Sequence, residues 1–188
     1  MKELIDKAKL FAMLEIEEHG TPALEHFELS NKMGQELAEK HEANKDLVML
    51  GTILMDVKLG ECIKEGKVKE HIERSADATE KFLTDLNVDE ETKEKILNCV
   101  RAHHGTAPFD CIEAEVCANA DCYRFLTPKG IFTYFRLLGN RFDDLTPVLD
   151  QVVMKMEEKW NVLTFDECKK ELEPYFNEFQ ELIKKAKE

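Results

Sequence analysis

Histidines and aspartates recur along the first two thirds of this chain, each beside apolar residues in a stretch with helical spacing. Helices of a bundle can direct such side chains inward to a shared pocket. Imidazole nitrogen and carboxylate oxygen are ligands for divalent cations such as manganese, iron or magnesium. The candidate metal ligands are His26, Asp56, His71, His103, His104 and Asp121.

Taken one at a time, these residues have simpler interpretations. A lone His26 on a helix is more often a hydrogen-bonding side chain than a ligand. His103 and His104 could interact with carbonyls at a helix end. Asp56 is harder to explain, because it follows the apolar run LVMLGTILM and an unpaired buried carboxylate is costly. Together, the residues favour a metal pocket over coincidence.

Helix-capping residues divide the chain into segments that would position these ligands. Thr21, followed by Pro22, is expected to start a helix that runs to about His41. Four more starts are expected: at Asn44 or Asp46, at Asp89, at Asp110, and in the capping box that begins at Thr164.

Glycine and proline mark the expected helix ends. Gly60 and Gly66 bracket a turn before the helix of His71, and Gly105 follows the helix that carries the paired histidines. Thr127-Pro128 closes the segment of Asp121. Pro174 is expected to break or kink the last helix at Glu173.

The predicted fold is all-α, because no period-two alternation long enough for a strand is present. A single domain is expected over residues 1–188. Its helical bundle covers about residues 20–127, and C-terminal helices in 128–188 pack on that core. A wide apolar stripe is expected to make this contact, through Tyr175, Phe176, Phe179, Leu182 and Ile183.

Composition narrows the classes of protein. The 188 residues are 43% apolar and 35% charged, which suits one globular core. A net charge of −13 argues against nucleic acid as a partner, since binding to phosphates depends on Lys and Arg. No apolar stretch approaches the roughly 20 residues of a membrane span, and the N-terminus does not read as a signal peptide. A cytoplasmic protein without a membrane partner is expected, and the oligomeric state stays open.

The order and spacing of the candidate ligands resemble those of the HD-domain superfamily of metal-dependent phosphohydrolases. The resemblance covers about residues 20–127. The stretches that carry it are EHFELSNKMGQELAEKH with His26, LGTILMDVKLGE with Asp56, EHIERSADATEKFL with His71, VRAHHG with His103 and His104, and EAEVCANADCYRFL with Asp121.

This resemblance implies an HD-like helical bundle that binds one or two divalent ions. His26, Asp56 and Asp121 would hold one ion. Asp56 would bridge to a second ion, bound by His71 and by one or both histidines of the 103–104 pair. The implied reaction is hydrolysis of a small phosphorylated molecule, such as a phosphomonoester, nucleotide or cyclic nucleotide.

The chain departs from the family pattern at Met55, where the family has the histidine of its His-Asp pair. A thioether is a poor ligand for hard cations, so the first site lacks an imidazole. Met55→His is therefore expected to complete that site. The tail after the pair also differs and offers Lys58, which could hold a substrate phosphate or neutralise Asp56. Asp56 and Lys58 are the catalytic candidates.

Three functions are consistent with this pattern. The first is a phosphohydrolase with a modified metal site. The second is a catalytically degenerate HD-domain module that binds a ligand or a regulatory partner. The third is a mixed-valence di-iron oxygenase, although members of that class rely on the complete His-Asp pair.

Overall fold

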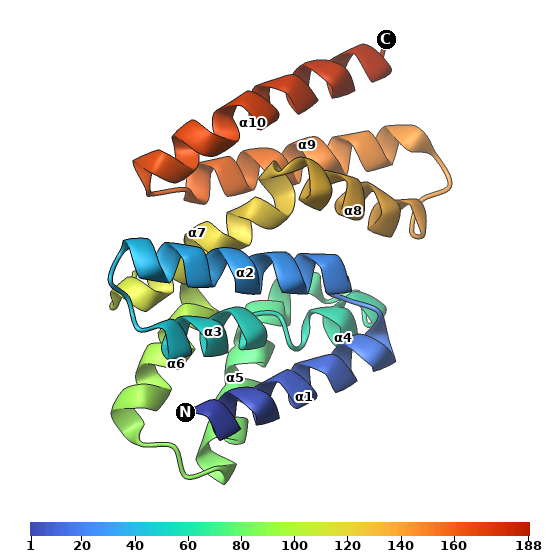
Figure 1. Cartoon of the computed structure of the whole chain (residues 1–188). Helices are drawn as coiled ribbons and strands as arrows, with labels where there is room; N and C mark the ends of the chain where they lie inside the picture. Colours follow the sequence, from blue (N-terminus) through green and yellow to red (C-terminus); the bar gives the residue numbers. More distant parts are fainter.

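The structure, a computed structural model that describes residues 1–188, consists of ten α-helices and one 3₁₀ helix without any strand (Figure 1). The predicted all-α class is confirmed. The helices are α1 (Lys2–His19), α2 (Leu24–Lys40), α3 (Lys45–Leu54), α4 (Leu59–Lys64), η1 (Val68–Glu70), α5 (His71–Asp85), α6 (Glu90–Ala102), α7 (Ile112–Leu126), α8 (Pro128–Gly139), α9 (Leu145–Val162) and α10 (Asp166–Ala186).

Two predicted helix caps and one predicted helix end are confirmed. The Asn44 side chain accepts hydrogen bonds from the backbone N–H groups of residues 46 and 47, at the start of α3. Asp89 caps α6 by accepting from Thr92 N–H. Thr127 ends α7 and also caps α8, where its hydroxyl accepts from Gly130 N–H. Side chains therefore satisfy N–H groups that a helix start leaves without partners.

Three other predicted starts are wrong, because tertiary contacts engage the expected caps. The Thr21 hydroxyl accepts from Arg141, and α2 instead begins after Ala23. Asp110 exchanges hydrogen bonds with Asn98, and α7 begins after Cys111. Thr164 accepts from the Asn119 amide, and α10 begins after Phe165. Local sequence gives no sign of these distant partners.

The glycine and proline predictions have mixed outcomes. Gly66 and Gly105 have φ of +72° and +67°, as turn glycines should. Gly60 instead lies inside α4, where an added Cβ would collide with His19 at the end of α1. Of the break or kink expected at Glu173, the break is wrong, because α10 continues through Pro174. Lys170 and Pro174 are both exposed, so water can satisfy the carbonyl that proline leaves without a donor.

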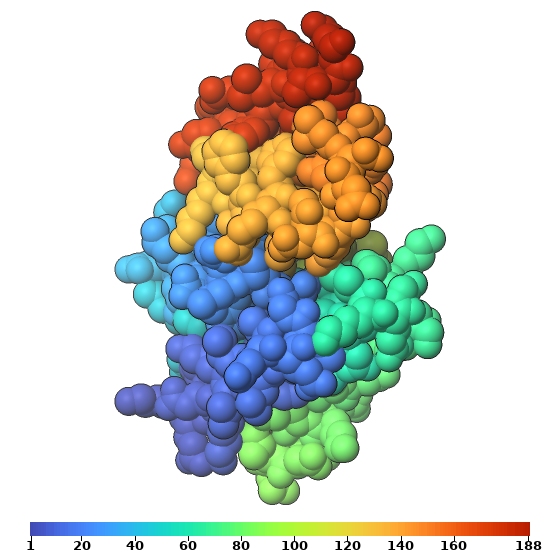
Figure 2. Space-filling view, turned by 90° about the vertical axis from the view of Figure 1, so that its right-hand side faces the viewer, coloured from blue at the N-terminus to red at the C-terminus, as the bar shows by residue number.

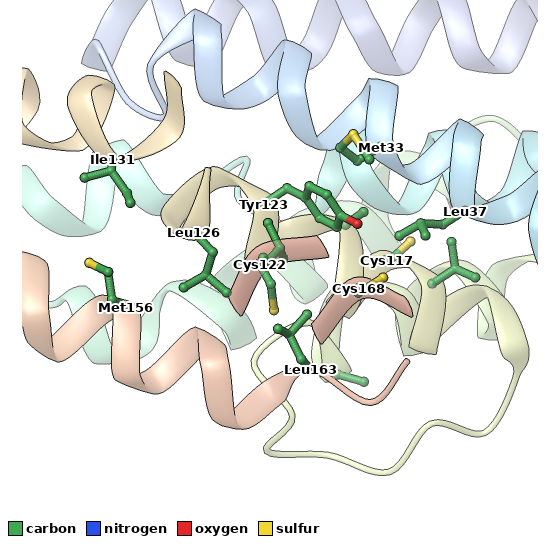
Figure 3. Packing of buried hydrophobic residues seen from close by; sticks show 14 of the residues in the cluster. Met33, Leu37, Cys117, Cys122, Tyr123, Leu126, Ile131, Met156, Leu163 and Cys168 are labelled. Atoms are coloured by element: carbon green, nitrogen blue, oxygen red, sulfur yellow. The ribbon is translucent and has the colours of Figure 1, made fainter. Parts of the chain in front are cut away.

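The helix α7 is enclosed on all sides. Nearly every residue from Glu113 to Leu126 is buried, and the helix contacts α2, α3, α6, α8, α9 and α10. It contributes to a 25-residue hydrophobic cluster, in which Leu126 lies near Ile131 of α8 and Met156 of α9, and Tyr123 extends toward Met33 of α2 (Figure 3). A second cluster of 13 residues joins α1, α2, α3, α5 and α6. The candidate ligands lie on α2, α5 and α7 or directly after α3 and α6, and packed helices therefore position them.

The helices after Thr127 extend the first of these clusters. Their contribution runs from Ile131 to Ile183, and Figure 2 shows α10 at one end of the molecule. Phe179 and Ile183 are buried, but Tyr175 and Leu182 are 37% and 52% exposed. The expectation that the whole stripe packs on the core is wrong for those two, because α10 packs mainly on α9 and α7 and leaves its outer side in solvent. No helix combines the length and apolar character needed to cross a membrane.

We propose that residues 1–188 fold as one unit, and truncation tests this. Cutting the chain after Thr127 removes nearly half of the 25-residue cluster and exposes the outer face of α7. Fragment 1–127 should therefore be insoluble, or compact without cooperative unfolding, when thermal melts are followed by near-ultraviolet circular dichroism alongside the full chain. A cooperative transition in the fragment would show that the N-terminal bundle is independent.

Candidate metal centre

Three histidines converge where α5 begins and α6 ends. His71 is the first residue of α5, and His103 and His104 directly follow α6. Each offers one ring nitrogen that lies within 4.8 Å of the other two. Their ring centroids are 4.4 to 5.9 Å apart. The structure thus brings together the predicted ligands of the second site.

Backbone carbonyls fix two of these rings. Nδ1 of His71 lies 2.6 Å from the carbonyl oxygen of Val68, and Nδ1 of His103 lies 2.6 Å from that of Val100. A carbonyl can only accept, so Nδ1 carries the proton and Nε2 keeps its lone pair when the ring is neutral. Burial lowers the pKa of His71, which favours the neutral ring. Metal-binding histidines are commonly oriented in this way.

The third histidine faces a carboxylate. Nδ1 of His104 lies 3.0 Å from Oε1 of Glu158 on α9. Burial, together with the charge of Lys159, lowers the pKa of His104 to about 3, so its ring is neutral at physiological pH. The α9 helix, outside the sequence resemblance, therefore supports a histidine of the cluster.

Asp56 completes this half of the site. Its Oδ1 lies 3.6 Å from Nε2 of His71 and 3.6 Å from Nε2 of His103, which is too long for hydrogen bonds. Asp56 Oδ1 and His103 Nε2 are both buried without a hydrogen-bond partner. All of these atoms are electron-pair donors, and a divalent cation is the partner that such a set lacks. Three imidazoles and a carboxylate therefore fit a transition-metal ion.

The predicted first site is different, because charged groups of the chain lie between its carboxylates. Nη1 of Arg124 donates to Asp56 Oδ2 at 2.6 Å and to Asp121 Oδ1 at 2.7 Å. Nζ of Lys159 lies 2.6 Å from Asp121 Oδ2. All four side chains are buried. A guanidinium and an ammonium thus take positions beside the carboxylates where the resemblance implied a metal ion.

These ion pairs keep both carboxylates charged. Burial opposes the ionisation of Asp56, but Arg124 and His103 hold its pKa well below the usual value. Burial also opposes the ionisation of Asp121, but Lys159 and Arg124 hold its pKa below the usual range. Asp121 in turn raises the pKa of Lys159 despite its burial. Two negative and two positive groups balance without a metal.

His26 reaches the site but is also engaged. Its Nε2 donates to the carbonyl oxygen of Gly130 at 2.8 Å, and burial lowers its pKa to about 4. An added Cβ at Gly130 would collide with the Arg124 carbonyl, so glycine permits the start of α8 to lie this close to the end of α7. The predicted first set of His26, Asp56 and Asp121 is therefore assembled, but its members bond to groups of the protein.

Lys58 does not reach the site. Its ammonium lies 2.7 Å from Oε1 of Glu15 and 2.9 Å from Oε2 of Glu61, and it is not part of the cavity lining. The structure thus gives no support to the predicted contact of Lys58 with phosphate, since two closer carboxylates hold it. Met55 is almost completely buried and is also outside the lining.

Sequence reasoning missed Arg124 and Lys159. Arg124 is three residues after Asp121 on one helix, a spacing at which side chains meet, so that pair was readable. The second bond of Arg124, to Asp56 on the segment after α3, could not be predicted from the spacing. Lys159 lies in the C-terminal third, which the resemblance did not cover.

A cavity of about 570 Å³ opens beside these groups. Asp56, His71, His104 and Asp121 lie in its wall, together with Arg124. Lys155 also lines it, with its ammonium 2.7 Å from Glu158 Oε2. A small anionic molecule could therefore approach the histidine cluster and meet positive charge.

Several solved structures have a similar arrangement of helices. An HD-superfamily hydrolase from Bacillus thuringiensis aligns over 98% of this chain and 95% of its own, with a TM-score of 0.67 and 20% identity. A predicted HD superfamily hydrolase from an uncultured Thermotogales bacterium aligns over 86% and 85%, with a TM-score of 0.59 and 14% identity. This chain has the HD-superfamily fold.

A third solved structure aligns over the whole chain. A protein from Lactobacillus plantarum aligns over 100% of this chain and 96% of its own, with a TM-score of 0.74 and 14% identity. By sequence, no family model and no curated protein matches the chain. The resemblance noted in the sequence is thus confirmed as a shared HD fold.

The buried charges predict a large effect of Lys159→Met. This change leaves Asp121 with Arg124 alone in the interior of the HD fold, and breaking a buried pair costs roughly 3–5 kcal/mol. The free energy of unfolding from urea titration should fall accordingly. The matched control is Lys95→Met, which removes an exposed pair with Glu91 and should change stability little. Equal effects of the two changes would contradict a structural role for the buried ammonium.

Proposed function

We propose that this chain is a metal-dependent phosphohydrolase that binds one exchangeable divalent ion and acts on a small phosphomonoester or nucleotide. One observation carries the proposal: Asp56 Oδ1 and His103 Nε2 are buried without partners in the group formed with His71 and His104, and these two histidines line a cavity. The HD fold supports it, since two similar structures are described as HD superfamily hydrolases.

The proposed ligands are His71, His103, His104 and Asp56. A divalent ion, when bound, would neutralise charge on a phosphoryl group and polarise water. The chain itself supplies the orientation of the ligands. The carbonyls of Val68 and Val100 hold two of the imidazoles with Nε2 toward the cluster.

Arg124 and Lys159 would take over part of the role of a first ion. They keep Asp56 and Asp121 ionised, and the bond from Arg124 to Oδ2 leaves Oδ1 of Asp56 directed to the histidines. Lys155 lines the cavity, and its ammonium is suited to bind a phosphate oxygen. Binding of the anion and neutralisation of its charge would thus be shared between one ion and the chain's own cations.

A second candidate is a catalytically degenerate HD module that binds a ligand without turnover. The neutralisation of both first-site carboxylates by Arg124 and Lys159 favours it, because these cations compete with a first metal ion and so disfavour a two-metal mechanism. The same pairs argue against a di-iron oxygenase, which needs two adjacent irons. Turnover with bound metal separates the first candidate from the second.

Metal content and hydrolysis test the proposal together. After loading with manganese or iron and removal of excess, the wild type should hold about one ion per chain by elemental analysis, and excess magnesium should not displace it. It should also hydrolyse 4-nitrophenyl phosphate. His71→Ala removes one imidazole from the cluster, and this variant should lose most of its bound metal and most of its hydrolytic activity. His41→Ala is the control, because the His41 ring bonds to Glu167 and is not part of the cluster. This variant should keep the metal content and the hydrolytic activity of the wild type.

The outcomes separate the candidates. Metal uptake that depends on His71 without any phosphoester hydrolysis would favour the binding module. No metal in the wild type, or equal metal in His71→Ala and wild type, would rule out the proposed centre.

The fixed cations also change what Met55→His should do. Because Arg124 and Lys159 already pair with Asp56 and Asp121, Met55→His alone should leave metal content at about one ion. Adding Arg124→Ala and Lys159→Ala removes the competing positive charges. This triple variant should bind a second ion and melt at a higher temperature with manganese than with chelator.

If the triple variant unfolds in chelator, it can be expressed and purified with manganese, and the number of bound ions per chain can still be measured. A second ion in Met55→His alone would show that the cations do not block the first site. If the folded triple variant still holds a single ion, Arg124 and Lys159 are not the groups that exclude a second ion.

A further inference from the structure

Apolar side chains form a large part of the cavity wall. Leu59, Ile63 and Val68, from α4 and η1, line one portion of its wall. Other apolar side chains of the lining come from α8, the loop after it and α9, namely Leu137, Leu138, Phe142 and Met154. The histidine cluster is therefore reached through walls that offer few hydrogen bonds.

Three of these apolar side chains are exposed to solvent. Val68, Phe142 and Met154 are 46%, 37% and 52% exposed, and they come from three separate segments of the chain. Single exposed apolar residues are ordinary, but a group around one cavity marks a binding surface for apolar groups. A ligand that covered them would remove this surface from water.

Neutral polar groups are scarce in the same lining. They are Thr21, which already accepts from Arg141, together with Tyr134 and Gln151. A nucleoside brings a base edge and ribose hydroxyls, and buried polar groups without partners are costly. The lining is thus a poor match for a nucleoside and a good match for a hydrocarbon or aromatic body.

Positive side chains of the lining favour an anionic head on this ligand. Lys155 is largely buried, and Lys69 and Arg141 are exposed members of the same wall. They stand out in a chain whose net charge is −13, which would otherwise repel an anion. The cavity volume of about 570 Å³ lies in the range of small-molecule sites.

We infer that the substrate is the phosphate monoester of an apolar alcohol, with an alkyl or aryl body, rather than a nucleotide. The phosphate would lie at the histidine cluster beside Lys155. The body would pack on Leu59, Val68 and Met154. This inference rests on the proposed function for the phosphate end, and on the apolar lining alone for the body.

Binding of a phosphonate series tests the inference without turnover. Methyl-, butyl- and hexylphosphonate, with adenosine monophosphate, are titrated by calorimetry into the full chain loaded with manganese. Affinity should rise roughly four-fold for each methylene that becomes buried, the equivalent of about 0.8 kcal/mol. Hexylphosphonate should therefore bind at least ten-fold more tightly than methylphosphonate, by the same estimate, and more tightly than the nucleotide.

Variants of the cavity mouth assign the effect to these walls. Val68→Ser and Met154→Ser should each reduce the gain in affinity from methyl- to hexylphosphonate several-fold. Leu10→Ser and Met13→Ser are matched controls, since both residues are exposed apolar side chains of α1 outside the cavity. The controls should keep the full dependence on chain length.

The results distinguish a failure of this inference from a failure of the proposed function. Equal affinity along the series, no phosphonate binding, or tighter binding of the nucleotide would overturn the apolar substrate class. Chain-length dependence that persists in Val68→Ser and Met154→Ser would overturn it as well. If alkylphosphonates bind as expected but no phosphoester is hydrolysed, the ligand class stands and the hydrolase proposal fails.

Discussion

The site depends on one guanidinium that lies between two buried carboxylates. Asp56 and Asp121 could not both remain ionised away from water without a positive partner, because desolvation and mutual repulsion would raise their pKa values. Arg124 bonds to one oxygen of each, and Lys159 pairs with the remaining oxygen of Asp121. These bonds connect the segment after α3 to α7 and α9, so the C-terminal helices are part of the site as well as of the core.

This arrangement separates folding from metal binding in the first half of the site. Where a metal ion holds ligands together, the folded state gains stability only when the ion is present. Here the balancing charges are covalently part of the chain and are always present. The histidine cluster is different, because backbone carbonyls orient two of its rings and Glu158 faces the third. The cluster is therefore arranged to receive an ion without needing one to keep its shape.

Much of this could be predicted from the sequence, and the failures have a common cause. The candidate histidines and aspartates were recognised from their types and their places in helical segments, and the resemblance to the HD superfamily divided them into two sites. The Asn44 and Asp89 caps were predicted because they act locally. Lys58 and Thr164 misled because the partners that engage them are distant in sequence. Lys159 was missed for the same reason: an ammonium on a late helix carries no mark that it will meet Asp121. Interactions between neighbours in the sequence could be predicted, whereas ion pairs between distant residues could not.

The two oxygens of Asp56 have different partners, and this limits which ion suits the centre. Oδ2 is bonded to Arg124, so part of the carboxylate charge is already compensated before any ion approaches Oδ1. Magnesium depends on oxygen ligands and full negative charge, and this site offers only one such oxygen beside three imidazoles. Imidazole is a good ligand for iron and other transition metals. Among the cations that the sequence left open, we therefore infer that manganese or iron fits this centre better than magnesium, because the internal cations leave a nitrogen-rich donor set.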